Sequence, residues 1–300
     1  MKILKWIGIV LGSLLLILVI AVAVMSFLFD QRNNKVYALD VPEVAIPTSP
    51  EAIAEGERLT AINCAGCHGE QLQGTPFFNA GPIGVVNAPN LTTGANGIGA
   101  TYGAQDWVHA IRYGVKQDGT SAFIMPAWHL WYMNDTDLGN LLAYVTQVPA
   151  VDAPPRVREF YPLGKVLYTL GAFGDQLQAE IIDPASPRPA DVPVGETAAY
   201  GEYVANVSGC RSCHGMNLAG GKNGDPAAML APNLTPGGEL MGWTVANFDT
   251  ALRTGQTPTG RELDRTQMPW GDFQHLNDLE VNAIWLYLQS LEALPANPAS

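Results

Sequence analysis

Two short stretches of this 300-residue chain combine cysteine with histidine. The first Cys-x-x-Cys-His motif consists of Cys64, Cys67 and His68, and the second consists of Cys210, Cys213 and His214. In a helical turn, positions i, i+3 and i+4 share one face, so all three side chains can bind the same group. Two cysteines at this spacing form thioethers with the vinyl groups of one haem, while the histidine ligates its iron. We therefore predict two covalently attached haem c groups, with His68 and His214 as iron ligands.

Three other uses of paired cysteines fit less well. A thioredoxin-like redox pair needs a surrounding βαβ pattern, of which the sequence shows no sign. A Cys₄ zinc ribbon places its pairs about 15–20 residues apart, whereas Cys64 and Cys210 are 146 residues apart. A disulfide within each pair explains neither the adjacent histidine nor the duplication. Four cysteines are also too few for a disulfide-dense scaffold of this length.

The cysteine motif is one landmark of an internal repeat. Residues 88–92, Ala-Pro-Asn-Leu-Thr, return unchanged as residues 231–235. Met125 and Met268 are each followed by proline, and each lies 35 residues after the asparagine of its segment. The gap from the first cysteine to that asparagine is 26 residues in one copy and 23 in the other. The chain therefore contains two copies of one unit, which differ in the length of one loop.

The sixth position on each iron requires a thioether or a second histidine. Met125 and Met268 are the methionines at matched repeat positions, and we predict that they are the axial ligands. The other methionines considered have no counterpart in the repeat and are interpreted as packing residues: Met25, Met133, Met229 and Met241. The remaining histidines are also unmatched and are interpreted as surface or hydrogen-bonding residues, with bis-histidine ligation as the alternative: His109, His129 and His275.

Helix signals surround each cysteine motif. Ser49 before Pro50 predicts a helix that runs to about Asn63, and Gly195-Glu196 opens its counterpart. Asn134 and Asn277 are candidate N-caps for terminal helices over about 135–147 and 278–292. The intervening loops are rich in Gly, Pro, Asn and Thr, which suits a unit whose core is supplied by a large prosthetic group. Between the units, apolar residues at helical spacing over 163–182 predict an ordered linker that packs against both.

The N-terminal run from Trp6 to Phe29 contains no charged residue. About 20 such residues span a bilayer, and a cleaved signal peptide has a shorter apolar region of about 7–15 residues. We therefore expect an uncleaved membrane anchor. The basic residues at its two ends orient it only weakly. Because haem is attached to such motifs outside the cytoplasm, we expect both units at the periplasmic face of the cell inner membrane, on a proline-containing tether (residues 31–50) that gives them reach.

Each unit resembles a class I cytochrome c domain: a helix leading into Cys-x-x-Cys-His, a Pro-Asn-Leu loop, a Met-Pro loop and a closing helix. The whole chain resembles membrane-anchored dihaem cytochromes c and is similar to two of the three domains in the cytochrome subunits of membrane-bound alcohol and gluconate dehydrogenases. The resemblance implies an all-α fold of two tandem domains after a single N-terminal transmembrane helix. The expected parts are an anchor (1–30), a tether (31–50), domain 1 (51–150), a linker (151–191) and domain 2 (192–295).

The resemblance also implies roles for individual residues. The carbonyls of Pro89 and Pro232 would accept hydrogen bonds from His68 and His214, which fixes the rings and raises ligand basicity. Asn90 and Asn233 are candidates to stabilise the methionine loop or a haem propionate, with turn chemistry as the alternative. Further candidate propionate partners, for which ordinary packing is the alternative, are Trp107 and Trp243 with Arg112 and Arg253.

Methionine opposite histidine leaves no open position on the iron, so we expect single-electron transfer and no catalysis. The leading function is a carrier between respiratory or photosynthetic complexes, and the alternative is a fixed subunit of a dehydrogenase or haem–copper oxidase. A dihaem peroxidase needs a sixth position that opens, which two matched methionines disfavour.

The formal net charge of −12 argues against nucleic acid as a partner. Residues 51–150 carry −5 and residues 192–295 carry −6, so both units are acidic. We therefore expect redox partners with basic docking patches and encounter rates that depend on salt.

Overall fold

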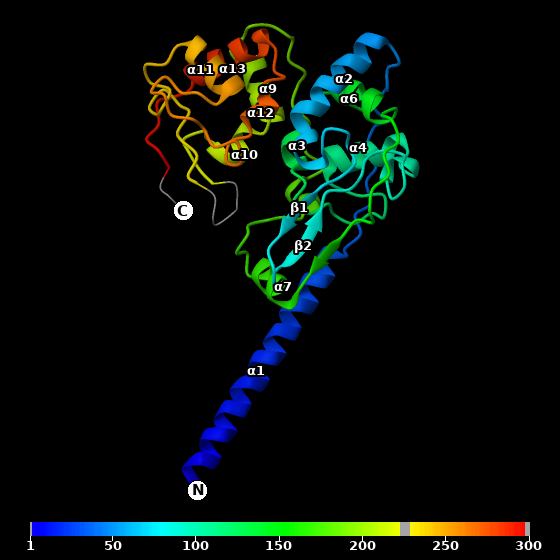
Figure 1. The fold of residues 1–300 in the computed structure, drawn as a ribbon, viewed down its shortest axis with the longest axis vertical. Helices are drawn as coiled ribbons and strands as arrows, with labels where there is room; N and C mark the ends of the chain where they lie inside the picture. The colour runs from blue at the N-terminus through cyan, green and yellow to red at the C-terminus, as the bar shows by residue number, and fades with distance from the viewer. Residues whose placement is uncertain (1, 223–228, 298–300) are drawn as a thin grey trace.

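One long helix, α1, leads into a body made of two mainly helical units (Figure 1). The computed structural model describes residues 2–222 and 229–297, so residues 223–228 of the expected second domain lie outside the described part. The first unit and its surroundings contain α1 (Lys2–Asn33), α2 (Pro50–Asn63), α3 (Ala65–His68), β1 (Pro76–Asn79), β2 (Gly84–Asn87), η1 (Ile98–Ala100), α4 (Ala104–Tyr113), α5 (Ala127–Leu130) and α6 (Asp135–Val145). The linker contains β3 (Arg158–Phe160), α7 (Pro162–Thr169) and α8 (Gln178–Ile181). The second unit contains α9 (Ala198–Val207), α10 (Cys210–His214), α11 (Val245–Thr254), α12 (Trp270–Phe273) and α13 (Asp278–Ser290).

Side-chain caps begin the long helices of both units. The Ser49 hydroxyl accepts from the N–H of Ala52, and α2 begins and ends where the sequence predicts. Asn134 and Asn277 cap α6 and α13 in the same way, which confirms both predicted N-caps. The counterpart of α2 begins later than Gly195 predicts, because the hydroxyl of Thr197 caps α9.

In each unit the first helix crosses the last one at a glycine. A Cβ atom on Gly56 would lie 1.9 Å from the carbonyl oxygen of Asn140, and one on Gly201 would lie 1.9 Å from that of Ala283. Neither crossing has room for a side chain, so the glycines that match in the repeat are a steric requirement. The crossing brings the end of α2 or α9, and the cysteine motif that follows it, to the core of its own unit.

The linker joins the first unit instead of packing equally against both. Its strand β3 pairs antiparallel with β2, which pairs antiparallel with β1, so the three form a small sheet on an otherwise helical fold. The hairpin of β1 and β2 lies within the loop that is three residues longer in the first copy of the repeat. The linker helices α7 and α8 contact α1 and α5. The expectation that the linker packs against both units is therefore wrong for these elements.

The end of α1 is packed into the body. Phe29 is 5% exposed and lies in an aromatic cluster with Phe123, Phe160 and Tyr168. The ring centroids of Phe29 and Phe160 are 4.9 Å apart, in an edge-to-face arrangement. Because each aromatic ring in such a contact buries a large apolar area, the joint between helix and body is stiff.

Residues 34–49 lie along the first unit and do not form a free tether. The N–H of Tyr37 donates to the carbonyl of Gly119, and Val44 is buried. Gly139 on α6 approaches the carbonyl of Ala45 so closely that a Cβ atom would lie 2.3 Å from it. The expected reach of residues 31–50 is therefore not present, since backbone and side-chain groups along this segment contact the domain.

The two units meet in an approximately two-fold arrangement. Arg58 on α2 donates to both carboxylate oxygens of Glu280 on α13, at 2.7 and 2.8 Å. The Tyr203 hydroxyl on α9 donates to the carboxylate of Asp137 on α6. The matched glycines align Arg58 with Tyr203, and the matched N-caps align Asp137 with Glu280. Equivalent positions of the repeat therefore make reciprocal contacts across the joint.

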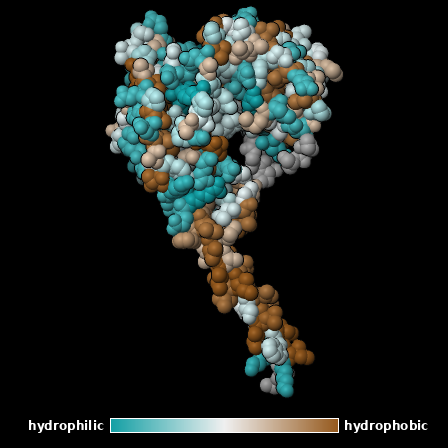
Figure 2. Space-filling model, turned by 180° about the vertical axis from the view of Figure 1, so that it is seen from behind, coloured by the Kyte–Doolittle hydropathy of each residue, from teal (hydrophilic) through white to brown (hydrophobic). Residues whose placement is uncertain are grey.

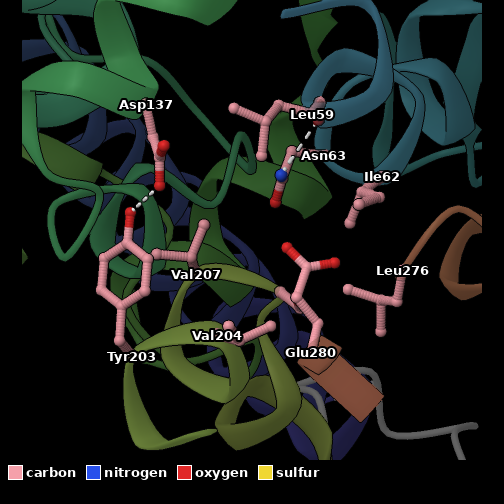
Figure 3. Close-up of a pocket in the computed structure, with 10 residues that line it drawn as sticks. Leu59, Ile62, Asn63, Asp137, Tyr203, Val204, Val207, Leu276 and Glu280 are labelled. Carbon is pink, nitrogen blue, oxygen red and sulfur yellow. Dashed lines mark hydrogen bonds between the residues drawn. The ribbon is translucent and has the colours of Figure 1, made fainter. Parts of the chain in front are cut away.

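A small cavity lies at this joint (Figure 3). Leu59 and Ile62 of α2 lie on one side of it, and Val204 and Val207 of α9 lie on the other. Burial alone would lower the pKa of the Arg58 guanidinium, but its bonds with Glu55 and Glu280 hold that pKa well above its ordinary value. Arg58 and Glu280 thus both stay charged next to apolar surface. The attraction between them offsets the cost of removing each charge from water.

We predict that Arg58→Met destabilises the protein, because it leaves the buried Glu280 carboxylate without its cation. The free energy of unfolding should fall by about 2–3 kcal/mol, less than for a fully buried pair because Arg58 is partly exposed. In the double variant Arg58→Met with Glu280→Gln, the loss of unfolding free energy should be smaller than the sum of the two single losses by at least about 1 kcal/mol. Urea denaturation followed by circular dichroism measures the cycle. Additive losses would contradict a direct coupling between the units.

Candidate haem sites

The two cysteine motifs form the single helical turns that the spacing predicts. Cys64 ends α2 and precedes α3, and α10 begins at Cys210 after Gly209 in a left-handed conformation with φ of 73°. The four cysteines are partly exposed and none forms a disulfide. Burial raises the pKa of the Cys64 and Cys210 thiols to about 12. A redox nucleophile or zinc ligand needs a lowered thiol pKa, so these surroundings suit uncharged thioether sulfur instead.

Both histidines of the motifs are held by the carbonyl of a proline. The Nδ1 atom of His68 lies 2.9 Å from the oxygen of Pro89, and that of His214 lies 2.8 Å from the oxygen of Pro232. These are the two hydrogen bonds that the resemblance to class I cytochromes implies. Burial lowers the pKa of both histidines, so the ring stays neutral, donates from Nδ1 and keeps Nε2 as a ligand atom.

The asparagine after each proline ties its loop to the end of the unit. The amide of Asn90 donates to the carbonyl of Val151 at 2.7 Å, and the amide of Asn233 donates to that of Leu294 at 2.7 Å. Their side-chain oxygens accept from backbone N–H groups two residues further on. The bonds accepted two residues further on are local turn chemistry, whereas the bonds to Val151 and Leu294 join segments 61 residues apart. Among the described contacts, neither amide reaches the methionine loop.

Met125 and Met268 pack on the same cores as the cysteine motifs. Met125 and Cys64 are half-buried against the first core, and Met268 and Cys210 against the second. The backbone enters the first Met-Pro loop through Ile124, whose φ of 69° is unusual for a branched residue. Of the unmatched methionines, Met133 is a fully buried member of the first core, Met25 is on α1, and Met229 and Met241 are exposed.

His129 lies at the joint between the units, which corrects its interpretation as a surface or hydrogen-bonding residue. It is 9% exposed, and neither ring nitrogen has a hydrogen-bond partner among the described residues. A Cβ atom on Gly209 would lie 2.3 Å from its Nδ1. Burial lowers the pKa of His129 to about 4. Asp272 occupies the matching repeat position, and its carboxylate approaches Gly66 in the first motif.

Arg112 and Arg253, the candidate propionate partners, both hold the beginning of the last helix in their units. Arg112 donates to the carbonyl of Met133 and pairs with Asp135 at 2.8 Å. Arg253 donates to the carbonyl of Leu276 at 2.9 Å and pairs with Asp249 and Asp278. The buried Nε of Arg112 has no hydrogen-bond partner among the described residues, so a propionate contact stays a prediction for this arginine.

The tryptophans are also paired differently from the sequence-based interpretation. The left-handed glycines that end α4 and α11, Gly114 and Gly255, align the two helices. In this register Trp107 corresponds to Phe248, and Trp243 corresponds to Tyr102. Trp107 is buried in the first core, with its ring centroid 5.0 Å from that of Tyr102.

Arg156 is a charged neighbour of the first site that the repeat could not reveal. Its Nε donates to the carbonyl of Asn87, two residues before the proline that holds His68, and its charge contributes to the lowered pKa of His68. It forms no ion pair with the described residues. Because Arg156 belongs to the linker, it has no counterpart in the second unit. Arg156 therefore makes the surroundings of His68 more electropositive than an otherwise equal site without this arginine.

The donors present fit haem c at both sites. Each site combines two uncharged thiols on one turn, a neutral histidine with Nε2 unpaired among the described residues, and a thioether on the same core. Haem c supplies reversible one-electron chemistry at its iron. The chain holds the proximal ring in one tautomer through the proline carbonyl and surrounds the site with apolar side chains.

Comparison with known families identifies both units. Residues 51–145 match the family described as cytochrome c oxidase, cbb3-type, subunit III, and residues 198–292 match the cytochrome c family. Fold and site thus define a c-type cytochrome domain that is present twice. The chain is a dihaem cytochrome c, and it carries two covalent haem c groups, attached at the motifs of Cys64 and Cys210.

Curated relatives are cytochromes of larger redox proteins. The chain is 26% identical over 279 residues to the cytochrome c subunit of a quinone alcohol dehydrogenase from Gluconobacter oxydans, which covers 81% of this chain and 55% of the relative. It is 26% identical over 280 residues to the gluconate 2-dehydrogenase cytochrome c subunit of Pantoea cypripedii, with 82% and 60% covered. A diheme cytochrome c-type protein of Cereibacter sphaeroides is 30% identical over 107 residues, 31% of this chain and 36% of the relative. The chain thus spans at most 60% of the length of these relatives.

We predict that the paired change Cys64→Ala and Cys67→Ala removes one of the two covalent haems, because no thioether remains at that motif. The haem-to-protein ratio, measured by pyridine haemochrome absorbance and intact mass, should fall from two to one. Cys210→Ala with Cys213→Ala is the matched change in the second unit and should also leave one haem. Two covalent haems in either variant would contradict the assignment of these sites.

Proposed function

We propose that this protein is a fixed electron-transfer subunit, which holds two six-coordinate haems at the periplasmic face of the inner membrane and passes single electrons to a partner complex. The observation that carries the proposal is the packed joint between α1 and the first unit, centred on Phe29. A mobile carrier would need a free tether at this point. The alternative, a carrier between membrane complexes, rests on the acidic surface and the single anchor.

Met125 and Met268 are the sixth ligands in this proposal. Both pack beside the cysteine motif of their unit, and both precede a proline that introduces a short helix, α5 or α12. A thioether opposite histidine fills the iron and favours its reduced state. With methionine in the sixth position, a substrate would have no open position on the iron, so the proposed ligands support electron transfer.

Helix α1 is the proposed membrane span. Its side chains are exposed from residue 3 to residue 21, and its apolar stretch is long enough to cross a bilayer. The end of α1 is continuous with the body, where Phe29 and Asn33 are buried. This packing supports a span that stays joined to the first unit.

Ion pairs support the same joint. Lys165 on α7 contacts both oxygens of Asp30 at 2.7 Å, and Arg32 pairs with Asp175 and Glu180. Part-exposed pairs contribute little individually, but a group of them around an aromatic cluster sets one orientation. The haem units would then sit at a constant height above the membrane, as suits a subunit docked on a second membrane protein.

The partner class follows from charge and from the relatives. Two acidic units favour a partner with a basic patch. The relatives that cover most of this chain are the cytochrome subunits of an alcohol and a gluconate dehydrogenase. A dehydrogenase that faces the periplasm is therefore our proposed electron donor, and a haem–copper oxidase is the second candidate, favoured by the match of residues 51–145.

We predict that Met125→His and Met268→His each lower one of two reduction potentials by on the order of 100 mV, because imidazole stabilises the oxidised iron relative to a thioether. Spectroelectrochemical titration gives the potentials, and the methionine-to-iron charge-transfer band reports ligation. Met241→His, at an exposed methionine, is the control and should leave both potentials unchanged. Unchanged potentials in Met125→His would refute its role as a ligand.

We also predict that gentle detergent extraction of native membranes yields this protein in a constant ratio with one oxidoreductase. The ratio, measured by native electrophoresis and quantitative mass spectrometry, should persist at low salt and decrease at high salt, since docking of an acidic surface is screened. Recovery of the protein alone at low salt would favour the carrier. Recovery without α1 would favour a cleaved signal sequence.

A further inference from the structure

Helix α7 of the linker lies antiparallel to α1. It contacts the C-terminal part of α1, where that helix leaves the proposed membrane and enters the body. Lys165, in its first half, contacts Asp30, while the hydroxyl of Thr169, its last residue, donates to the carbonyl of Met25 at 3.2 Å. As α7 advances by four residues, its contact on α1 moves back by five. The turn that follows α7 therefore points along α1 toward the proposed membrane (Figure 1).

The shielded face of α1 extends in the same direction. The residues of its last three turns that are buried or half-buried form a stripe at helical spacing: Val22, Met25, Ser26, Phe29, Asp30 and Asn33. Val22 lies seven residues before the end of the apolar run at Phe29, which is about 10 Å along a helix. A bilayer core takes about 20 of the 24 residues in that run. The end of α7 therefore lies beside residues that belong to the span itself.

The residues at that depth have the chemistry of a lipid-facing segment. From Tyr161 to Gly174 the only charged residue is Lys165, and Asp30 neutralises it. Leu170 is 67% exposed and Leu163 is 48% exposed. The hydrophobic surface of α1 continues up to the base of the body in the space-filling view (Figure 2). Isolated exposed leucines are common in proteins. Exposed leucines beside the end of a proposed membrane span, however, have the position and the composition expected of a lipid-contacting surface.

We propose that residues 161–174 form a second membrane contact, in which the end of α7 inserts Leu170 into the boundary between headgroups and acyl chains of the outer leaflet while Leu163 lies nearer the headgroups. Tyr161 lies at the other end of the segment, as aromatic residues do at membrane interfaces. A single span can rotate and tilt, whereas a span with an inserted lateral segment has one preferred orientation. The segment would thus set the tilt of both haem units. This inference rests on the proposed membrane span, but it does not depend on which complex the protein serves.

The test uses the full-length holoprotein in vesicles of phosphatidylethanolamine and phosphatidylglycerol. Because all four cysteines are attached to haem, Leu170→Cys creates the only free thiol for a nitroxide label. Electron paramagnetic resonance compares collision with oxygen, which partitions into lipid, and with a water-soluble nickel chelate. Met241→Cys, 75% exposed in the second unit, is the matched aqueous control, and Ile17→Cys in the middle of α1 is the lipid control.

We expect the oxygen-to-nickel collision ratio of the Leu170 label to exceed that of the Met241 label at least fivefold and to approach that of the Ile17 label. A Leu170 label equal to the aqueous control beside a lipid-like Ile17 label would overturn the second contact and leave the span intact. An aqueous Ile17 label would refute the span, and with it this inference. A Leu170 label that is inaccessible to both reagents would mean that protein covers the segment, which also overturns the proposal.

Discussion

The close crossing of the first and last helix is the contact on which each haem unit depends. Gly56 against Asn140 and Gly201 against Ala283 bring two helix backbones to a distance that any side chain would prevent. Because α2 and α9 lead directly into the cysteine motifs, this crossing decides where the thiols and the proximal histidine lie. The proline carbonyl then fixes the ring, and the asparagine after it ties that loop to the segment that follows the last helix.

The two units have diverged around this shared frame. The first has acquired a β-hairpin, the linker strand β3, helix α7 and the end of α1, all of which lie on one side of it. The second has none of these described additions. The first unit is thus the one that bears the anchor, and Arg156 of the linker adds a positive charge beside its histidine. A repeat that began as two equal sites has become asymmetric through its connecting segments.

The difference between the shared frame of the units and the segments added to the first unit explains what could be predicted from the sequence. The cysteine motifs, the caps at Ser49, Asn134 and Asn277, and the tandem arrangement depend on local patterns, and these predictions agree with the structure. The joint at Phe29 depends on residues far apart in the chain, so residues 31–50 were expected to be a free tether. The contacts of Arg112 and Arg253 with the start of the last helix also lay beyond the sequence, because a repeated arginine can serve a helix end as well as a cofactor.

The reciprocal contact between the units has a consequence for electron transfer. Arg58 with Glu280 and Tyr203 with Asp137 join the first helix of each unit to the last helix of the other. The same arrangement puts His129 beside the second motif and Asp272 beside the first. With both cysteine motifs facing this joint, a change of distance between the haems would require these bonds to break. The two motifs therefore belong to one packed body, and this joint is the part of the structure that would set electron exchange between the units.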